Sequence, residues 1–152
     1  MTATDFIPAV SGHPVVDQYL ASMSLSWQQR ASVRQAVDEM FGRLAQAGRP
    51  NNLATSMAAA ICAAIYAVND RGMTDADSDR YLLAVNDRLG AAPRIANMSQ
   101  LEKQTLSDTL VFQATMIALL HQLGTRDPQA RLQSIQLSHM VLQQLTGSPT
   151  GG

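Results

Sequence analysis

The sequence has little charge, few aromatic side chains and almost no cysteine. Only 15% of its 152 residues are charged, and the 11 basic and 12 acidic side chains are scattered singly. Such a surface offers no electrostatic footprint for a phosphate backbone or an anionic bilayer. Three Phe, three Tyr and one Trp are too few for a base-stacking platform. We therefore expect no nucleic-acid partner.

Cys62 is the only cysteine, which excludes an internal disulfide and a cysteine metal cluster. Its alanine-rich surroundings predict a small core side chain, removed from any substrate. A signal peptide is also missing from the chain as given, because MTATDFIPAVSGHP has neither a basic start nor a long apolar stretch. The compartment is therefore unknown: cytoplasmic if the chain is full length, exported or periplasmic if a signal peptide was removed.

Long hydrophobic runs are absent as well. The longest apolar stretch, Leu53 to Val68, has 16 residues, contains Thr55 and Ser56, and is rich in alanine. A membrane-spanning helix needs about 20 predominantly apolar residues, so we expect a soluble chain with no membrane span.

The most informative feature that is present runs from Asn52 to Asp70, NLATSMAAAICAAIYAVND. A helix that is apolar nearly all round is covered by neighbours on most of its faces. With 46% hydrophobic residues and the length of one ordinary domain, the chain can bury about two-thirds of its unfolded surface. The Asn52 to Asp70 segment is therefore predicted to be the central helix.

Helix start and stop signals recur along the rest of the chain, and strand signals are absent. The predicted helices run over 15–23, from a cap at Ser24 or Ser26 to Gly48, over 74–90, over 99–123 and over 127–147. Ser99 and Glu102 fit a capping box, and Asp127 precedes a proline at the first helical position. We predict an all-α, single-domain bundle of about five helices around the Ala-rich central helix. It comprises a partly ordered leader (1–14), a helical domain (15–147) and a mobile tail (148–152).

Small side chains on the central helix predict close approach to the apolar segment Leu110 to Leu120. Bulky residues are then expected to fill the adjacent space: Met116, Ile117, Leu119 and Leu120.

The sequence gives little support for catalysis or metal binding. The spacing of Asp75, Asp77 and Asp79 resembles a calcium loop, but the sixth and twelfth positions are Arg80 and Asn86 instead of Gly and Glu. An acidic first helical turn explains these aspartates better. Nucleotide-binding and hydrolase motifs are absent too. We expect a non-enzyme with no catalytic residue, cofactor or metal ion.

His121 and His139 each fall beside apolar residues on a helical wheel and could face each other across the bundle. Further metal ligands at helical spacing are missing, which favours hydrogen-bonded histidines at the edge of the core.

Several segments together resemble a family of small bacterial proteins known only as a domain of unknown function. They cover about two-thirds of the chain and are NNLATSMAAAICAAIYAVNDRGMTDAD, MSQLEKQTLSD, LVFQATMIALLHQL and SHMVLQQLTG. Members are often exported and are predicted to be helical, with no established activity, so the resemblance implies a helical fold and points to export. This chain departs from the family in lacking a signal peptide and a Trp in the central helix.

Two functions remain open. The first is a protein-binding module, such as an adaptor, chaperone or immunity-type partner of a bacterial protein, whose partner could also be a second copy of itself. The leader and the next helix, DFIPAVSGHPVVDQYL, would cover an apolar patch or exchange between subunits. The alternative is a small-ligand or lipid carrier with an apolar cavity between helices. The residues expected to bind that ligand are Thr55, Ser56, Tyr66, His121 and His139.

Overall fold

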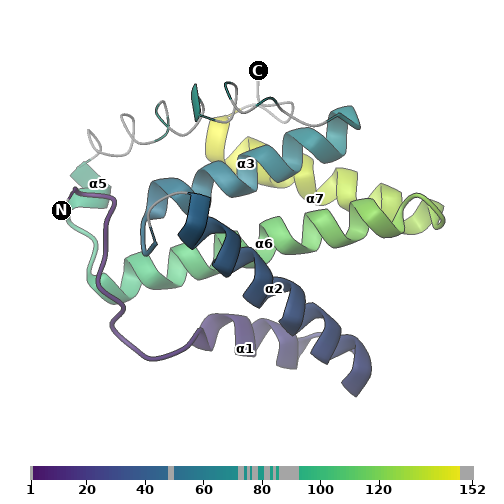
Figure 1. Ribbon diagram of the computed structural model, residues 1–152, viewed down its shortest axis with the longest axis horizontal. Helices are drawn as coiled ribbons and strands as arrows, with labels where there is room; N and C mark the ends of the chain where they lie inside the picture. The colour runs from purple at the N-terminus through teal and green to yellow at the C-terminus, as the bar shows by residue number, and fades with distance from the viewer. Residues whose placement is uncertain are drawn as a thin grey trace.

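Helices build this chain, as Figure 1 shows. The computed structural model describes residues 2–47, 50–71, 74, 76, 79–80, 83, 85 and 93–147. Within them lie α1 (Pro14–Ser22), α2 (Trp27–Ala47), α3 (Leu53–Asn69), α5 (Pro93–Ala96), α6 (Gln100–Leu123) and α7 (Pro128–Thr146). Strand pairing among the described residues is limited to one isolated bridge, between Asp5 and Asn52. The predicted all-α class is confirmed.

One helix of the structure was not predicted, and two predicted segments lie largely or wholly outside the described residues. The short helix α5 was not expected from the sequence. The predicted helix over 74–90 falls largely outside the described residues, and the tail 148–152 falls wholly outside them.

Capping boxes start two of the helices. At the start of α6, the Glu102 amide donates to Ser99 Oγ (3.1 Å) and the Ser99 amide donates to Glu102 Oε1 (3.2 Å), as predicted. The same reciprocal pair starts α2, where the Gln29 amide donates to Ser26 Oγ (3.1 Å) and the Ser26 amide donates to Gln29 Oε1 (2.9 Å). Ser26, rather than Ser24, is therefore the cap, and both boxes satisfy amides that a helix start leaves unpaired.

The ends of α3 and α7 also follow the sequence signals. Asn52 caps α3 by accepting from the Thr55 amide, and Asp70 closes that helix with a left-handed φ of 55°. Asp127 caps α7, and Gly147 closes it with a φ of 76°, a conformation that glycine adopts without steric cost.

The largest apolar cluster joins α3, α6 and α7. Ala60 and Ala64 of α3 are fully buried beside Ala114 and Ile117 of α6, and Val141 of α7 closes the cluster. The close approach predicted for the alanine-rich helix is therefore confirmed. Within the part of the chain that the structure describes, no helix combines the length and apolarity needed to cross a bilayer.

Helix α6 shares the centre of the fold with α3. Its opposite side carries Phe112, which forms a second cluster with Val16 and Leu20 of α1 and Val37 of α2. In Figure 1, α3 and α7 accordingly lie above α6, and α1 lies below it. Met116 packs into this second cluster. The expectation that it fills space beside the alanines is wrong, because it projects from the other side of α6.

Of the other three bulky residues predicted for that space, Ile117 is fully buried there, while Leu119 and Leu120 are half-buried. The segment Leu110 to Leu120 therefore presents a narrower face to α3 than its composition indicates.

The turn from α6 to α7 depends on a close approach at Gly124. A Cβ added there would lie 2.8 Å from the Cα of Arg131, although the backbone itself is helical (φ −62°). Glycine therefore serves here because it lets α7 fold back tightly against α6, and a larger residue would push the two helices apart.

Candidate binding site

The leader (1–14) is attached to the start of α3 by backbone and side-chain bonds. The Phe6 amide donates to the Asn51 carbonyl (2.9 Å), and the Leu53 amide donates to the Thr4 carbonyl (2.8 Å). Phe6 is buried, as are Thr4 and Asp5. This part of the leader therefore lies in contact with the body of the molecule.

Asn52 uses both ends of its amide at this junction. Its Oδ1 accepts from the Thr55 amide (3.0 Å), which caps α3. Its Nδ2 donates to Thr4 Oγ1 (3.0 Å) and to Asp5 Oδ1 (2.7 Å). Asp or Ser could cap the helix equally well, but neither could also supply these two donated bonds. One residue thus starts the central helix and holds the leader.

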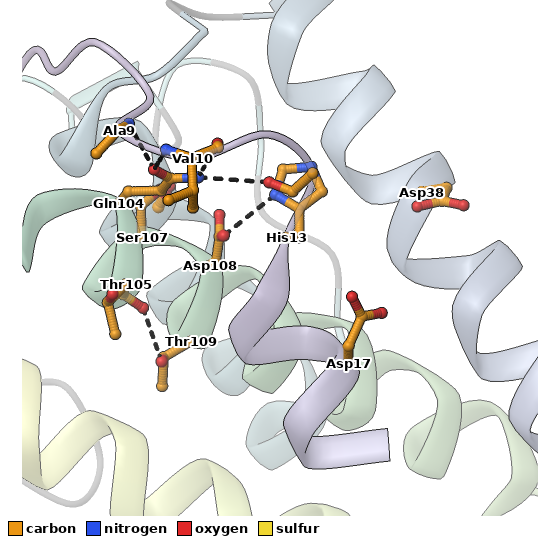
Figure 2. Close-up of polar contacts among 12 residues, drawn as sticks. Ala9, Val10, His13, Asp17, Asp38, Gln104, Thr105, Ser107, Asp108 and Thr109 are labelled. Atoms are coloured by element: carbon orange, nitrogen blue, oxygen red, sulfur yellow. Dashed lines mark hydrogen bonds and ion pairs between the residues drawn. The ribbon is translucent and has the colours of Figure 1, made fainter. Parts of the chain in front are cut away.

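Gln104 of α6 holds the next part of the leader, as Figure 2 shows. Its Oε1 accepts from the amides of Ala9 (2.8 Å) and Val10 (3.2 Å). Its Nε2 donates to the carbonyls of Val10 (3.0 Å) and Gly12 (3.4 Å). Gly12 has a left-handed φ of 71°, which turns the chain into α1 without the strain another residue would meet.

These contacts belong to a polar stripe along α6. Gln100 accepts from the Ile7 amide (2.7 Å), and buried Lys103 donates to the Asp5 carbonyl (3.4 Å). Gln104, Ser107 and Asp108 continue the stripe and are buried too. Residues three or four apart on a helix share a face, so the stripe forms one continuous seam under the leader.

His13 and Asp108 meet at the end of this seam. Nδ1 of His13 lies 3.1 Å from Oδ2 of Asp108, at ion-pair distance. The two groups are not aligned for a hydrogen bond, so Nδ1 is buried without one among the described residues. The Asp108 side chain is only 4% exposed, whereas that of His13 is 34% exposed. The His13 ring also stacks on Phe41 of α2, with ring centres 3.8 Å apart.

A cavity of about 330 Å³ lies between the leader, α2, α3 and α6; we call it the leader cavity. Its apolar wall includes Phe6, Val10, Phe41, Leu44 and Val111. Its polar wall includes Asn52, Thr55, Ser56, Gln104, Ser107 and Asp108, together with His13. A few convergent polar groups on an otherwise apolar wall are typical of small-molecule sites.

The sequence-predicted ligand residues are divided between two places. Thr55 and Ser56 line the leader cavity, where Ser56 and Ser107 share a short hydrogen bond of 2.5 Å between their hydroxyls. Tyr66 lies ten residues further along α3, roughly 15 Å away at about 1.5 Å per residue. It is not among the described residues lining the cavity.

Tyr66 instead contacts His121 edge-on, with ring centres 4.8 Å apart, and His121 Nε2 lies 3.2 Å from Oδ1 of Asp70. His139 is half-buried on α7 and is not among the described lining residues. The described residues contain no group of three or more His, Cys, Asp or Glu placed to hold a metal ion. Asp75 and Asp77 lie outside them.

Sequence reasoning missed His13, Gln104 and Asp108. On α6 the polar positions read as the solvent side of an amphipathic helix, and only their long-range contacts show that the leader covers them. A signal was available in the i, i+4, i+8 spacing of Gln100, Gln104 and Asp108, which places hydrogen-bonding groups in one row.

Comparison with known families gives one match. A model described as a family of unknown function (DUF6683) matches residues 2–138. The chain belongs to this family. The DUF6683 match includes all the described residues that line the leader cavity. No curated protein and no solved structure matches the chain. Membership of a family of unknown function, which the resemblance predicts, is confirmed.

Proposed function

We propose that this chain is a non-enzymatic binding protein that holds a small molecule in the leader cavity. The observation that carries the proposal is a cavity of about 330 Å³ with a buried carboxylate and several amides and hydroxyls in its wall. Ligand pockets have volumes of about 300–1,000 Å³, so this one suits a compact molecule better than a lipid. The alanines of α3 pack closely in the core, and the cavity lies at the start of that helix instead.

A variant that fills the cavity tests this proposal. Ala45 of α2 is exposed and lines the cavity, so Ala45→Trp should block it without disturbing the core. Ligand-observed NMR with benzyl alcohol should detect binding to the original chain and none to this variant. Ala118→Trp, at an exposed position on α6, is the matched control and should bind like the original chain. Equal binding by all three proteins would contradict the proposal.

Native mass spectrometry of freshly purified protein complements this test, since it reports both a retained ligand and the number of subunits. The bacterial origin and export that the family resemblance points to remain part of the proposal. Recovery of the native protein from periplasmic or culture fractions would support export.

A second candidate is a protein-interaction module, and Trp27 favours it. This residue begins α2 and is 81% exposed, which is unusual for the largest apolar side chain. It borders a hollow of about 290 Å³ together with Asp17, Arg30 and Arg34. A surface with both signs of charge suits an isologous contact, in which the same patch faces itself, so the proposed partner is a second copy.

Sedimentation velocity over a range of concentrations tests the second candidate. The original chain should form a dimer that Trp27→Ala weakens, because exposed tryptophans often dominate interface energies. Leu132→Ala, which removes an exposed apolar side chain from α7, is the control and should leave the dimer intact. A monomer at every concentration would refute self-association through this surface.

A further inference from the structure

The described residues that line the leader cavity carry an unbalanced charge. Among the described residues that line it, Asp108 is the only aspartate or glutamate, and there is no lysine or arginine. Among these described lining residues, His13 alone can offset this carboxylate, and its side chain is far more exposed. The described wall is therefore suited to a neutral or positively charged ligand and unsuited to an anion.

The bonding of Asp108 leaves capacity for another donor. A carboxylate accepts about four hydrogen bonds, and the contact with His13 engages one oxygen without hydrogen-bond alignment. A buried charge is stable only when it is paired and hydrogen-bonded. A donor group on a ligand, placed in the cavity beside Asp108, would supply a hydrogen bond that the described protein residues do not give this carboxylate.

Further acceptors lie in the same wall. The hydroxyls of Ser56 and Ser107 bond to each other, and each oxygen keeps a lone pair after that bond. An ammonium group has three donors and no acceptor, so it matches a wall that offers a carboxylate together with hydroxyl oxygens. A neutral hydroxyl on a ligand has one O–H to donate, so it would satisfy only one of these acceptors.

We infer that the ligand of the leader cavity is a small organic cation whose ammonium group pairs with Asp108. This inference rests on the proposed function, because it names the ligand class of the same site. The apolar wall, with Phe6, Phe41 and Val111, receives the carbon body of the ligand. At about 30 Å³ for a water-sized group, the cavity accommodates roughly ten non-hydrogen atoms.

Three probes of nearly equal size separate charge from shape: benzylammonium, benzyl alcohol and benzoate. Their affinities for the whole chain are measured by ligand-observed NMR and calorimetry. Benzylammonium should bind about tenfold more tightly than benzyl alcohol, the difference made by one charge-assisted hydrogen bond, and benzoate should not bind.

Asp108→Asn keeps the shape of the side chain and removes its charge, so benzylammonium should then bind no more tightly than benzyl alcohol. Asp38→Asn, at an exposed carboxylate on α2, is the matched control and should keep the tenfold preference. His13→Gln provides a second readout that does not alter Asp108. It should tighten benzylammonium binding, because the neutral glutamine amide cannot form the ion pair by which His13 competes for the carboxylate.

The outcomes distinguish the two proposals. Binding of benzyl alcohol with no preference for benzylammonium, or a preference that survives Asp108→Asn, overturns the cation inference and leaves the proposed binding function standing. A His13→Gln variant that binds benzylammonium no more tightly than the original chain also overturns it. Failure of all three probes to bind overturns both proposals.

Discussion

Gln104 forms hydrogen bonds with the backbone of the leader, as a neighbouring strand does in a sheet. Its single amide accepts from two backbone N–H groups and donates to two carbonyls, so one side chain satisfies the backbone of Ala9, Val10 and Gly12. Segments without secondary structure must find such partners when they are covered, because an unpaired backbone group is costly to bury. Beyond its backbone bonds to the start of α3, the leader is therefore held by the side chains of few residues.

Replacing Gln104 by alanine should therefore release the leader. The variant leaves two amides and two carbonyls without their partners, and the loss should lower the free energy of unfolding by about 1–3 kcal/mol. Urea denaturation measures this change, and limited proteolysis should show earlier cleavage within the leader.

Gln136→Ala, at an exposed position on α7, makes the same chemical change where the side chain faces solvent. It should alter stability by less than about 0.5 kcal/mol. Equal stability of the two variants would show that Gln104 does not hold the leader.

At the scale of elements, α3 and α6 run in the same direction. Ser56 meets Ser107 near their starts, and Tyr66 meets His121 near their ends. Between these contacts, alanines of both helices face each other in the core. The thinness of α3 brings its backbone near α6, so this contact depends on side chains staying small.

Enlarging a core alanine tests that dependence. Ala60 is fully buried, so Ala60→Leu should overpack the contact and cost about 1–3 kcal/mol or more, seen as a lower melting temperature. Ala63, which is half-buried against the same cluster, should show a smaller loss with the same change.

Ala118→Leu supplies the reference, since Ala118 lies on the exposed face of α6. It should leave the melting temperature nearly unchanged. If Ala60→Leu and Ala63→Leu melt at the original temperature as well, the alanine contact does not require small residues.

The elements themselves were largely predictable, because their signals are local. Ser99 with Glu102, and Asp127 with its proline, lie within a few residues of the amides that they satisfy. The leader cavity was not predictable in the same way. His13 and Asp108 are separated by most of the chain, and a polar residue on a helix looks the same whether solvent or a covering segment faces it. Two of the five predicted ligand residues, Thr55 and Ser56, still lie beside the cavity.

At the scale of the whole molecule, the described residues form two apolar clusters with α6 between them. The larger joins α3, α6 and α7, and the smaller joins α1, α2 and one side of α6. Helix α2 has 21 residues, and Val37 is its only buried one. The smaller cluster therefore relies on α1 as much as on α2.

Deleting residues 1–22 should expose that cluster. Phe6, Val16 and Leu20 are lost, and at about 1.5–3 kcal/mol for each buried side chain the cost is of the order of 5 kcal/mol. We expect a lower melting temperature. We also expect larger assemblies in sedimentation velocity, since Phe112 and its neighbours would be exposed and could be buried again by association between chains.

Trp27→Ala is the control for stability, because it removes an apolar side chain that the fold leaves outside. A truncated chain with the original stability and the original oligomeric state would exclude any covering role for the leader and α1.

The exposure of Trp27 has a spectroscopic consequence. Trp27 is the chain's only tryptophan, so it dominates the fluorescence excited at long ultraviolet wavelengths. Its indole is already exposed to water in the folded protein. Unfolding of the core should hardly shift the wavelength of its emission maximum. Tryptophan emission would therefore miss the transition that circular dichroism records. A blue shift would instead report that something has covered the start of α2. The protein thus carries an intrinsic optical probe of that surface and needs no added dye.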